Sequence, residues 1–237
     1  MCGRYVHPDD AAMERAWHVG RDNSNPFARQ FNVLPTSIVP LLRRDPESGK
    51  LALAGARWGL IPHWWKDATL PKFTINARAE EAAGKPMWRH AWRHARCLIP
   101  AEGWYEWREL ERVSRETGEV KKYKQPYYIH RSDEHPFCFA GLMALWQKSG
   151  LDDMTLSCAI ITKPAAGPAT EVHDRMPVVL PAQAFEEWSD SAVTDAARVQ
   201  SIIAECAQSD FAFHAVSTKV NSSRSAGPDL IEPAEFA

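Results

Sequence analysis

The sequence predicts an α+β fold built on a mainly antiparallel β-sheet. Short segments rich in β-branched, aromatic and apolar residues outnumber the segments that favour helix. The two kinds of segment do not alternate along the chain, as they would in a doubly wound parallel fold. The length of 237 residues is enough to bury one sizeable core. We therefore expect a single compact domain that spans residues 1–237.

Seven segments have the composition of β-strands. Each is short and dominated by β-branched, aromatic or other apolar side chains, which fit a pleated, partly buried surface. In chain order they are residues 37–42, 51–58, 97–100, 127–130, 137–145, 155–162 and 211–216.

Five segments are expected to be helical. They are residues 9–17, 78–83, 87–94, 182–188 and 192–207. The last of them follows Asp190 and Ser191, whose short polar side chains are good N-cap residues. We therefore expect this helix to begin directly after that pair.

Two stretches differ from the rest of the chain. Residues 109–124 are dense in charge and contain Thr117-Gly118, which indicates a turn, so we expect a solvated hairpin or loop insertion there. Residues 225–237 include Pro228 and Pro233 and are expected to form a surface-packed or frayed C-terminal tail.

The composition limits the possible classes of function. Apolar residues make up 45% and charged residues 24%, which is typical of a soluble globular protein. The net charge is -2, so any nucleic-acid site must be a local basic patch. The N-terminus does not resemble a secretory signal, and no apolar run approaches the ~20 residues that cross a bilayer. We expect a cytoplasmic protein with no membrane partner.

The five cysteines do not suggest a disulfide framework, because their number is odd and no export signal is visible. Cys97, Cys138, Cys158 and Cys206 are expected to be buried thiols, since apolar residues surround them in the sequence. Cys2 differs from them in its polar neighbours and its position next to Met1.

Cys2 is a candidate nucleophile. Removal of Met1, which is usual before a small residue, would leave a 1,2-aminothiol at the N-terminus. The α-amine has an ordinary pKa of about 7.7–8.0 and the thiol one of about 8.5, so both are partly deprotonated at neutral pH. The amine can form an imine with an aldehyde, and the thiol can then close a thiazolidine ring. The alternative is that position 2 is simply free to vary.

The segment 101–107 places two carboxylates among aromatic residues. Burial beside indoles raises the pKa of a carboxyl group, which suits a general acid or base. Glu102 and Glu106 could share one face of an extended segment, or a turn at Gly103 could separate them. The alternative is that both are solvated and that only the aromatic residues are buried.

Two further polar segments are candidates for the same site. His173 is a natural proton shuttle near neutral pH, and Arg175 could hold a phosphate. Asn76 and Arg78 follow an apolar residue, and Arg78 is expected near a helix N-terminus, where amides and a cation can bind phosphate together. A lone His-Asp pair in a loop, such as His173-Asp174, is more often structural.

The sequence contains ten tryptophans, most of which are expected in the core. The pair Trp64-Trp65 is the best candidate for an exposed platform on which bases could stack. His90 and His94 have the spacing of a zinc-protease helix but lack its glutamate, so no metal is expected. No phosphate-binding loop or dinucleotide fingerprint occurs, and we expect no cofactor.

Taken together, these segments resemble the SRAP family of abasic-site processing proteins, named after an SOS-response-associated peptidase. The matching motifs are MCGR at 1–4, FNVLPT at 31–36, RWGLIP at 57–62, INARAE at 75–80, RCLIPAEGWYEW at 96–107, FAGL at 139–142, ITKPA at 161–165, HDRMPV at 173–178 and VN at 220–221. Their order and the cysteine at position 2 carry the resemblance.

The resemblance implies a sheet curled into a barrel-like core with helices around it. It also implies a catalytic set of Cys2, Asn76, Glu106 and His173, with Glu106 rather than Glu102 in the family's Tyr-Glu-Trp motif. The residues that would grip DNA are Arg4, Arg78, Thr162 and Arg175, to which the composition adds Trp64 and Trp65.

The expected partner is single-stranded DNA that contains an abasic site, and the expected state is a monomer. Three alternatives belong to other classes. They are an N-terminal-nucleophile cysteine peptidase, a non-covalent module that binds single-stranded DNA, and a reader of a modified base. The resemblance thus predicts a covalent thiazolidine crosslink between Cys2 and the ring-opened aldehyde of the abasic site. A crosslink that survives denaturing electrophoresis would separate this interpretation from the three alternatives.

Overall fold

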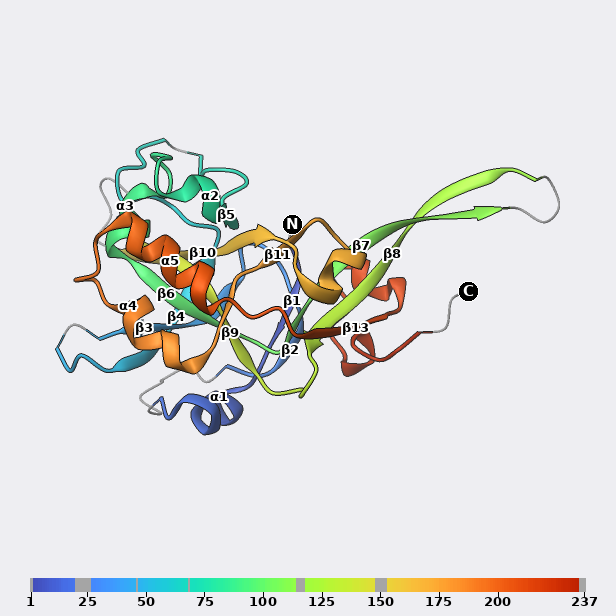
Figure 1. Ribbon diagram of the computed structural model, residues 1–237, viewed down its shortest axis with the longest axis horizontal. Coiled ribbons are helices and arrows are strands. Elements are labelled where there is room, and N and C mark those ends of the chain that lie inside the picture. The colour runs from blue at the N-terminus through green and yellow to red at the C-terminus, as the bar shows by residue number, and fades with distance from the viewer. Residues whose placement is uncertain are drawn as a thin grey trace.

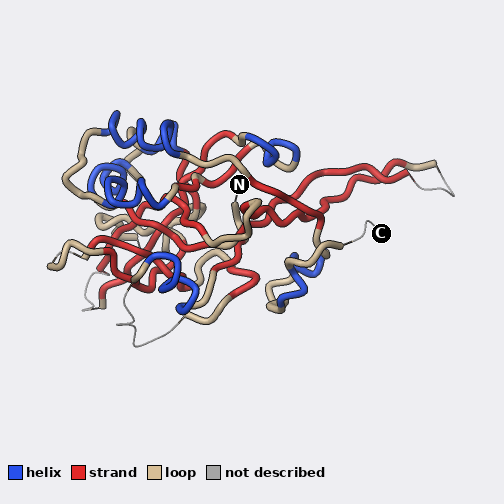
Figure 2. The backbone as a smooth tube through the Cα atoms, turned by 60° about the horizontal axis from the view of Figure 1, so that its bottom comes forward, coloured by secondary structure: helices blue, strands red, loops and turns tan. Residues whose placement is uncertain are grey.

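The computed structural model describes residues 2–19, 27–45, 47–67, 69–113, 118–147 and 153–234. Its strands form a body from which one long hairpin projects (Figure 1). Most of the interior is strand, with the helices at the periphery (Figure 2). No helix in these residues is long and apolar enough to span a membrane.

Five strands close into a barrel. They are β3 (Ile38–Arg44), β4 (Leu51–Trp58), β6 (Arg96–Ala101), β9 (Phe137–Gln147) and β10 (Met154–Pro164). The order is β10-β4-β3-β6-β9, and β9 pairs again with β10, so the ring is complete. The β10–β4 pair is parallel and the other four are antiparallel. The predicted α+β fold with a mainly antiparallel, barrel-like sheet is confirmed.

Three short strands extend the barrel sheet near one end of β10 and β9. They are β5 (Asn76–Arg78), β11 (Arg175–Pro177) and β12 (Val179–Leu180). The parallel strand β5 and the antiparallel strand β11 both pair with β10, where Thr162 lies opposite Arg78 on one side and Pro177 on the other. This arrangement brings two of the segments singled out in the sequence next to each other.

A second, open sheet lies against the barrel and forms the hairpin. Its strands are β1 (Tyr5–His7), β2 (Gln30–Val33), β7 (Gly103–Val113), β8 (Val120–Arg131) and β13 (Phe211–Ala215), in the order β13-β8-β7-β1-β2. The strands β7 and β8 pair over their full length without a register shift, from Gly103 opposite His130 to Val113 opposite Val120. The segment expected at 109–124 occupies the outer part of this ribbon, and its residues 114–117 lie outside the described part.

The core has two sides because the barrel strands are buried on both faces. On β6, for example, Cys97 and Ile99 pack with the residues that face the second sheet, whereas Leu98 packs with the helices. Successive side chains of a strand point to opposite faces, so a strand covered on both reads as a continuous apolar run. This explains why the segments predicted as strands lack a polar alternation.

Helices cover the other side of the barrel. They are α1 (Asp10–Trp17), α2 (Ala79–Ala82), α3 (Arg89–His94), α4 (Phe185–Ser189) and α5 (Ala196–Cys206), with the 3-10 turn η2 (Ala182–Ala184). Three further 3-10 turns, η1 (Gly167–Glu171), η3 (Thr218–Asn221) and η4 (Pro228–Leu230), contact strands of the second sheet instead. The predicted start of the last helix is wrong. Its N-cap is Asp195, whose side chain accepts a hydrogen bond from the Ala197 amide, whereas Asp190 accepts one from the Ala192 amide in a preceding turn.

Candidate active site

The side chain of Cys2 is buried beside the barrel. Only 1% of the residue is exposed, and it packs in the same apolar cluster as Trp104 and Tyr127. Strand β1 places it there, because Tyr5 lies opposite Trp104 and the Tyr105 amide donates to the Arg4 carbonyl. The polar sequence neighbours of Cys2 therefore did not indicate its surroundings. Among the other cysteines, Cys97, Cys138 and Cys158 are buried as expected, and Cys206 is half-buried.

Asn76 contacts Cys2 directly from strand β5. Its side-chain Nδ2 donates to the Cys2 carbonyl oxygen over 2.8 Å. The Asn76 Oδ1 atom is buried and has no hydrogen-bond partner in the described part of the chain. Asn76 therefore holds the backbone of Cys2 with one end of its amide and offers a buried acceptor at the other.

Glu106 is a buried carboxyl group on strand β7. It is 3% exposed, and burial raises its pKa above the usual range, while the neighbouring His173 lowers it by a smaller amount. Burial also raises the pKa of the Cys2 thiol well above its usual range, and the carboxyl of Glu106 raises it further. The thiol is therefore held in its protonated form beside a carboxyl group that keeps its own proton to a higher pH than an exposed glutamate does.

His173 approaches Glu106 from the loop between η1 and β11. Its Nε2 atom lies 3.9 Å from Glu106 Oε2, and its side chain is 27% exposed. Its Nδ1 atom accepts a hydrogen bond from the Arg175 amide over 2.9 Å. Asp174 Oδ1 also lies 2.7 Å from Nδ1, but the Asp174 side chain is 85% exposed. A ring nitrogen cannot accept one hydrogen bond and donate another at the same time, so Nδ1 can serve only one of these two partners. In the neutral ring the amide contact leaves the proton on Nε2, toward Glu106.

These four residues come from four distant segments and meet at one place. The arrangement joins a buried thiol, an amide that fixes its backbone, and a carboxyl–imidazole pair that is partly open to solvent. Glu102 does not belong to it. It lies between β6 and β7, where it forms an ion pair with Arg29. A candidate nucleophile and a candidate acid/base pair are thus within one site, an arrangement that suits attack on a carbonyl carbon.

Arg4 is occupied by protein acceptors. Its guanidinium donates to the Asn32 side chain over 2.9 Å, to the Val220 carbonyl over 2.6 Å and to the Asn221 carbonyl over 3.2 Å. These contacts join the start of the chain to η3. Arg78, in contrast, has a side chain that is 53% exposed, and its Nη1 atom lies 3.6 Å from Glu81 Oε1. It lies at the N-cap of α2, as expected.

Thr162 and Arg175 form one unit with Glu80. Arg175 donates both terminal nitrogens to the Glu80 carboxylate, over 2.7 and 3.0 Å, and its side chain is 14% exposed. It also donates to the carbonyl oxygen of Thr162 over 2.9 Å and to its hydroxyl oxygen over 3.3 Å. Thr162 itself is fully buried. In this state Thr162 positions the arginine and does not reach the surface.

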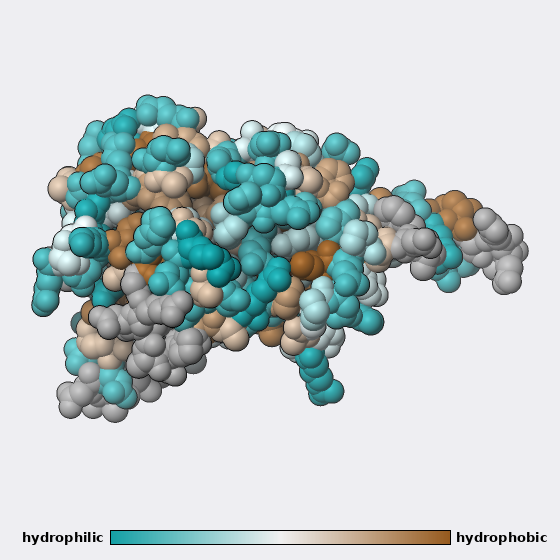
Figure 3. All heavy atoms as spheres, turned by 90° about the horizontal axis from the view of Figure 1, so that it is seen from below, coloured by the Kyte–Doolittle hydropathy of each residue, from teal (hydrophilic) through white to brown (hydrophobic). Residues whose placement is uncertain are grey.

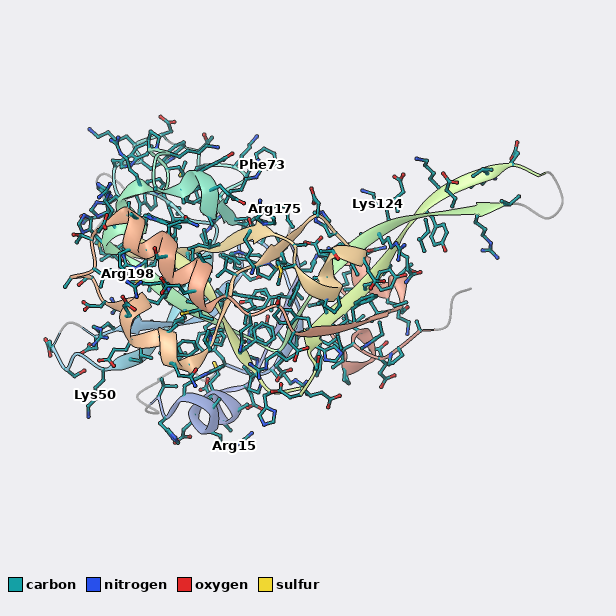
Figure 4. All side chains as sticks on the ribbon, viewed as in Figure 1. Arg15, Lys50, Phe73, Lys124, Arg175 and Arg198 are labelled. Atoms are coloured by element: carbon teal, nitrogen blue, oxygen red, sulfur yellow. The ribbon has the colours of Figure 1, made fainter. Side chains whose placement is uncertain are left out.

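The loop between β4 and β5 presents exposed aromatic residues. Trp64 is 43% exposed, whereas Trp65 is half-buried and its indole donates to the Thr69 carbonyl. Sequence reasoning missed Phe73, which is 92% exposed and has a left-handed φ of 59°. Figure 4 labels Phe73 and Arg175 along the same edge of the body. A signal was available, since Phe73 stands between the polar residues Lys72 and Thr74.

Among the described residues, no group of three or more histidine, cysteine, aspartate or glutamate side chains could hold a metal ion.

Comparison with known proteins gives consistent matches. The model of the family described as SOS response associated peptidase (SRAP) matches residues 1–223. The abasic site processing protein YoqW of Bacillus subtilis is 34% identical over 202 residues, which cover 85% of each chain. The abasic site processing protein YedK of Escherichia coli is 31% identical and covers 98% of this chain and 100% of its own. The crystal structure of a phage-related protein from Bordetella bronchiseptica superposes with a TM-score of 0.66 at 32% identity, covering 91% of this chain and 94% of that one.

Proposed function

The chain belongs to the SOS response associated peptidase (SRAP) family, and from this premise we propose that it captures abasic sites in single-stranded DNA by a covalent bond to Cys2. The names of YoqW and YedK support abasic sites as the target. The observation that carries the proposal is the meeting of Cys2, Asn76, Glu106 and His173 in one site.

The first chemical step is the opening of the sugar. An abasic deoxyribose is mostly a cyclic hemiacetal, so a base must take the proton of its C1′ hydroxyl and an acid must protonate O4′. Glu106 and His173 can share these transfers, because their side chains are 3.9 Å apart and burial raises the pKa of Glu106 above its usual range. The partial exposure of His173 gives the sugar access to the pair.

The second step joins the protein to the aldehyde. Removal of Met1 by hydrolysis of its peptide bond frees the α-amine of Cys2. The amine nitrogen attacks the aldehyde carbon, and the adduct loses water to form an imine. The thiol sulfur then adds to the imine carbon while its proton passes to the nitrogen, which gives a thiazolidine. The amine acts first because burial keeps the thiol protonated.

Asn76 is proposed to position the nucleophile. Its bond to the Cys2 carbonyl survives the loss of Met1, because that carbonyl belongs to the Cys2–Gly3 peptide. The buried Oδ1 atom can accept a hydrogen bond from the new α-amine or from a sugar hydroxyl. Either bond would orient an attacking group without taking part in the covalent change.

The DNA contacts are proposed to be independent of sequence. Arg78 is exposed and can bind a phosphate directly, and Trp64 and Phe73 offer faces for bases beside the lesion. Arg4, Thr162 and Arg175 are proposed to shape this surface through the contacts described above. Low sequence preference suits a sensor of lesions, which can arise anywhere in DNA.

A peptidase or lyase reaction would use the same residues. Glu106 is close enough to Cys2 to raise the pKa of its thiol, so it could act as the base that removes Met1 autocatalytically. Proteolysis of other proteins is less well supported, because a cysteine peptidase needs a thiolate and burial opposes its formation.

The test is a crosslinking assay with Cys2→Ser as the variant. We expect the parent protein to form a product with an abasic oligonucleotide that survives denaturing electrophoresis, and Cys2→Ser to form none that is stable to heat. An imine of the variant should still be trapped by borohydride. An oligonucleotide whose sugar lacks the aldehyde is the control, and mass spectrometry confirms the loss of Met1. Undiminished heat-stable product from Cys2→Ser would overturn the proposal.

A further inference from the structure

The two faces of the projecting hairpin differ in charge. Since β7 and β8 pair in unbroken register, residues two apart on one strand share a face with their cross-strand partners. On the first face, Arg108 lies opposite Gln125, Leu110 opposite Tyr123, and Arg112 opposite Lys121. This set contains three cations and no carboxylate. We call it the basic face.

The opposite face is neutral by comparison. It carries Glu109 opposite Lys124, Glu111 opposite Lys122, and Val113 opposite Val120. Lys122 donates to Glu109 over 2.7 Å, and this contact lowers the pKa of Glu109 and raises that of Lys122. Hydrophobic surface appears near the hairpin's end in Figure 3, where Val113 and Val120 are 61% and 57% exposed. The two faces of the hairpin therefore differ in net charge, since carboxylates balance the lysines on the opposite face alone.

The basic face continues the active-site face of β7. Glu106, Arg108, Leu110 and Arg112 are alternate residues of one strand, so their side chains leave β7 on the same side. The twist of the ribbon rotates this side gradually along the hairpin. From Glu106 to Arg112 the strand rises by roughly 20 Å, at about 3.3 Å per residue. A row of cations therefore runs outward from the candidate catalytic carboxyl along an arm that projects from the body (Figure 1).

The side chains of this row are available to a ligand. Arg108, Arg112 and Lys121 are exposed, and Tyr123 between them is 38% exposed. In the described part of the hairpin, Lys121 lies 3.9 Å from the carboxylate of Glu119, but both side chains are largely exposed and Glu119 precedes the paired strand. Cations that alternate with an aromatic ring match a single nucleic-acid strand, which offers phosphates and base faces in succession.

We propose that the basic face of the hairpin binds the backbone of single-stranded DNA that flanks the abasic site. The three cations bind phosphates and Tyr123 stacks on a base. This inference rests on the proposed function, since it extends the same DNA strand outward from the site. The proposed reaction at the candidate active site does not need the charged insertion at residues 109–124. This inference therefore gives that insertion a role of its own.

The test compares two double variants with the same change in charge. Arg112→Ala with Lys121→Ala removes two cations from the basic face, and Lys122→Ala with Lys124→Ala removes two from the opposite face. Affinity is measured on an undamaged oligonucleotide, so that crosslinking does not enter. We expect the first pair to weaken binding on the order of tenfold and to flatten the log–log salt dependence by about 1.4, at about 0.7 per phosphate contact. The second pair should change the slope by less than half of that.

A strand-length series and Tyr123 give independent readings. The effect of the first pair should disappear on an oligonucleotide too short to reach the arm. Tyr123→Ala should weaken binding about fivefold or more, and Tyr123→Phe should restore it, because the ring and not the hydroxyl stacks. Thermal unfolding of every variant should match the parent within a few degrees, since the substituted side chains are exposed.

The outcomes separate this proposal from the proposed function. Equal effects of the two pairs, or no effect of either, would overturn the binding of DNA by the basic face even if the parent protein crosslinks abasic DNA. A face-dependent loss of affinity would support it even if the parent forms no crosslink, and the proposed function alone would then fail.

Discussion

At the scale of single residues, Glu106 shows the conflict between stability and chemistry in this site. Its carboxyl group is 3% exposed, and burial raises its pKa. The folded state therefore binds the proton of Glu106 more tightly than the unfolded state does. Stability falls as pH rises from the ordinary pKa of glutamate through the raised one, and the loss is complete above the raised value. A protein tolerates such a group where its proton is useful.

We predict that Glu106→Gln stabilises the protein at neutral pH while it impairs crosslinking. Glutamine keeps the shape without a charge to desolvate, so Tm should rise by a few degrees, at about 2–4 °C for each kcal/mol. The gain over the parent should shrink toward zero as pH falls below the ordinary pKa of glutamate, where the parent residue is neutral too. Calorimetry at several pH values measures this. A variant that is less stable than the parent at pH 7 would contradict it.

His173 is predicted to affect the rate rather than binding. The His173→Ala variant should slow single-turnover crosslinking by ~10²–10⁴-fold, the usual contribution of general acid/base catalysis, with little change in affinity for single-stranded DNA. Asp174→Ala is the matched control, because this exposed carboxylate touches only the Nδ1 side of the ring. If His173→Ala crosslinks at the parent rate, the residue is structural.

Sequence reasoning selected these residues as candidates but did not predict all of their surroundings. Glu106 and His173 could be chosen because aromatic neighbours and an imidazole have recognisable chemistry. The burial of Cys2 could not, because it depends on the pairing of β1 with β7 across about 100 residues of chain. For the same reason nothing in the sequence showed that Arg4 would be held by carbonyls of η3.

At the scale of elements, the start of α5 shows how tertiary contacts override a local signal. Asp190 is as good an N-cap residue as Asp195. However, the guanidinium of the buried Arg96 donates to the carbonyl oxygens of Asp190 and Trp188. This contact holds Asp190 at the end of α4, and α5 instead begins after Asp195, whose side chain accepts from the Ala197 amide. A single-sequence pattern cannot include a partner that is about 90 residues away.

The link between β11 and α2 gives a prediction about DNA affinity. Glu80 neutralises Arg175 through two hydrogen bonds, so the arginine cannot attract a phosphate at full strength. We expect Glu80→Ala to raise affinity for single-stranded DNA and to steepen the salt dependence by up to about 0.7. The cost in stability should be at most about 1 kcal/mol, since Glu80 is 43% exposed and water screens the pair.

The control for this prediction is Glu81→Ala, which removes a carboxylate of the same helix that pairs with Lys85 and lies 3.6 Å from Arg78. A steeper salt slope for Glu80→Ala than for Glu81→Ala would assign the new phosphate contact to Arg175. Equal slopes, or an affinity that falls with Glu80→Ala, would leave Arg175 as a purely structural residue.

At the scale of the whole molecule, the closed barrel is what brings the site together. Strand β10 pairs with β9, β4, β5 and β11 at different points along its length, so the segments that contain Asn76 and His173 meet at one end of it. The composition and order of the strands could predict an antiparallel, curled sheet. They could not predict the parallel pairing of β10 with β4 and β5, because no local feature of a strand specifies a partner so distant in sequence.

The last prediction concerns Arg4, which ties the two ends of the chain together near the nucleophile. It donates to oxygens of Val220 and Asn221, and Asn32 beside it donates to the carbonyls of Ser222 and Ser225. Arg4→Ala removes a charged donor and leaves these acceptors partly unsatisfied, so we expect a loss of about 1–3 kcal/mol in unfolding free energy. Because Cys2 is two residues away, crosslinking should also slow at saturating DNA.

Arg78→Ala is the comparison, since that arginine is exposed and is proposed to touch phosphate alone. It should weaken DNA binding and flatten the salt dependence by about 0.7, with Tm and the crosslinking rate at saturation unchanged. Thermal unfolding and single-turnover crosslinking on the same two variants decide the matter. If Arg4→Ala reproduces the behaviour of Arg78→Ala, with an unaltered Tm, then Arg4 exchanges its carbonyl partners for a phosphate when DNA binds. If it instead lowers Tm and slows the reaction, the N-terminal nucleophile depends on a contact with the opposite end of the chain.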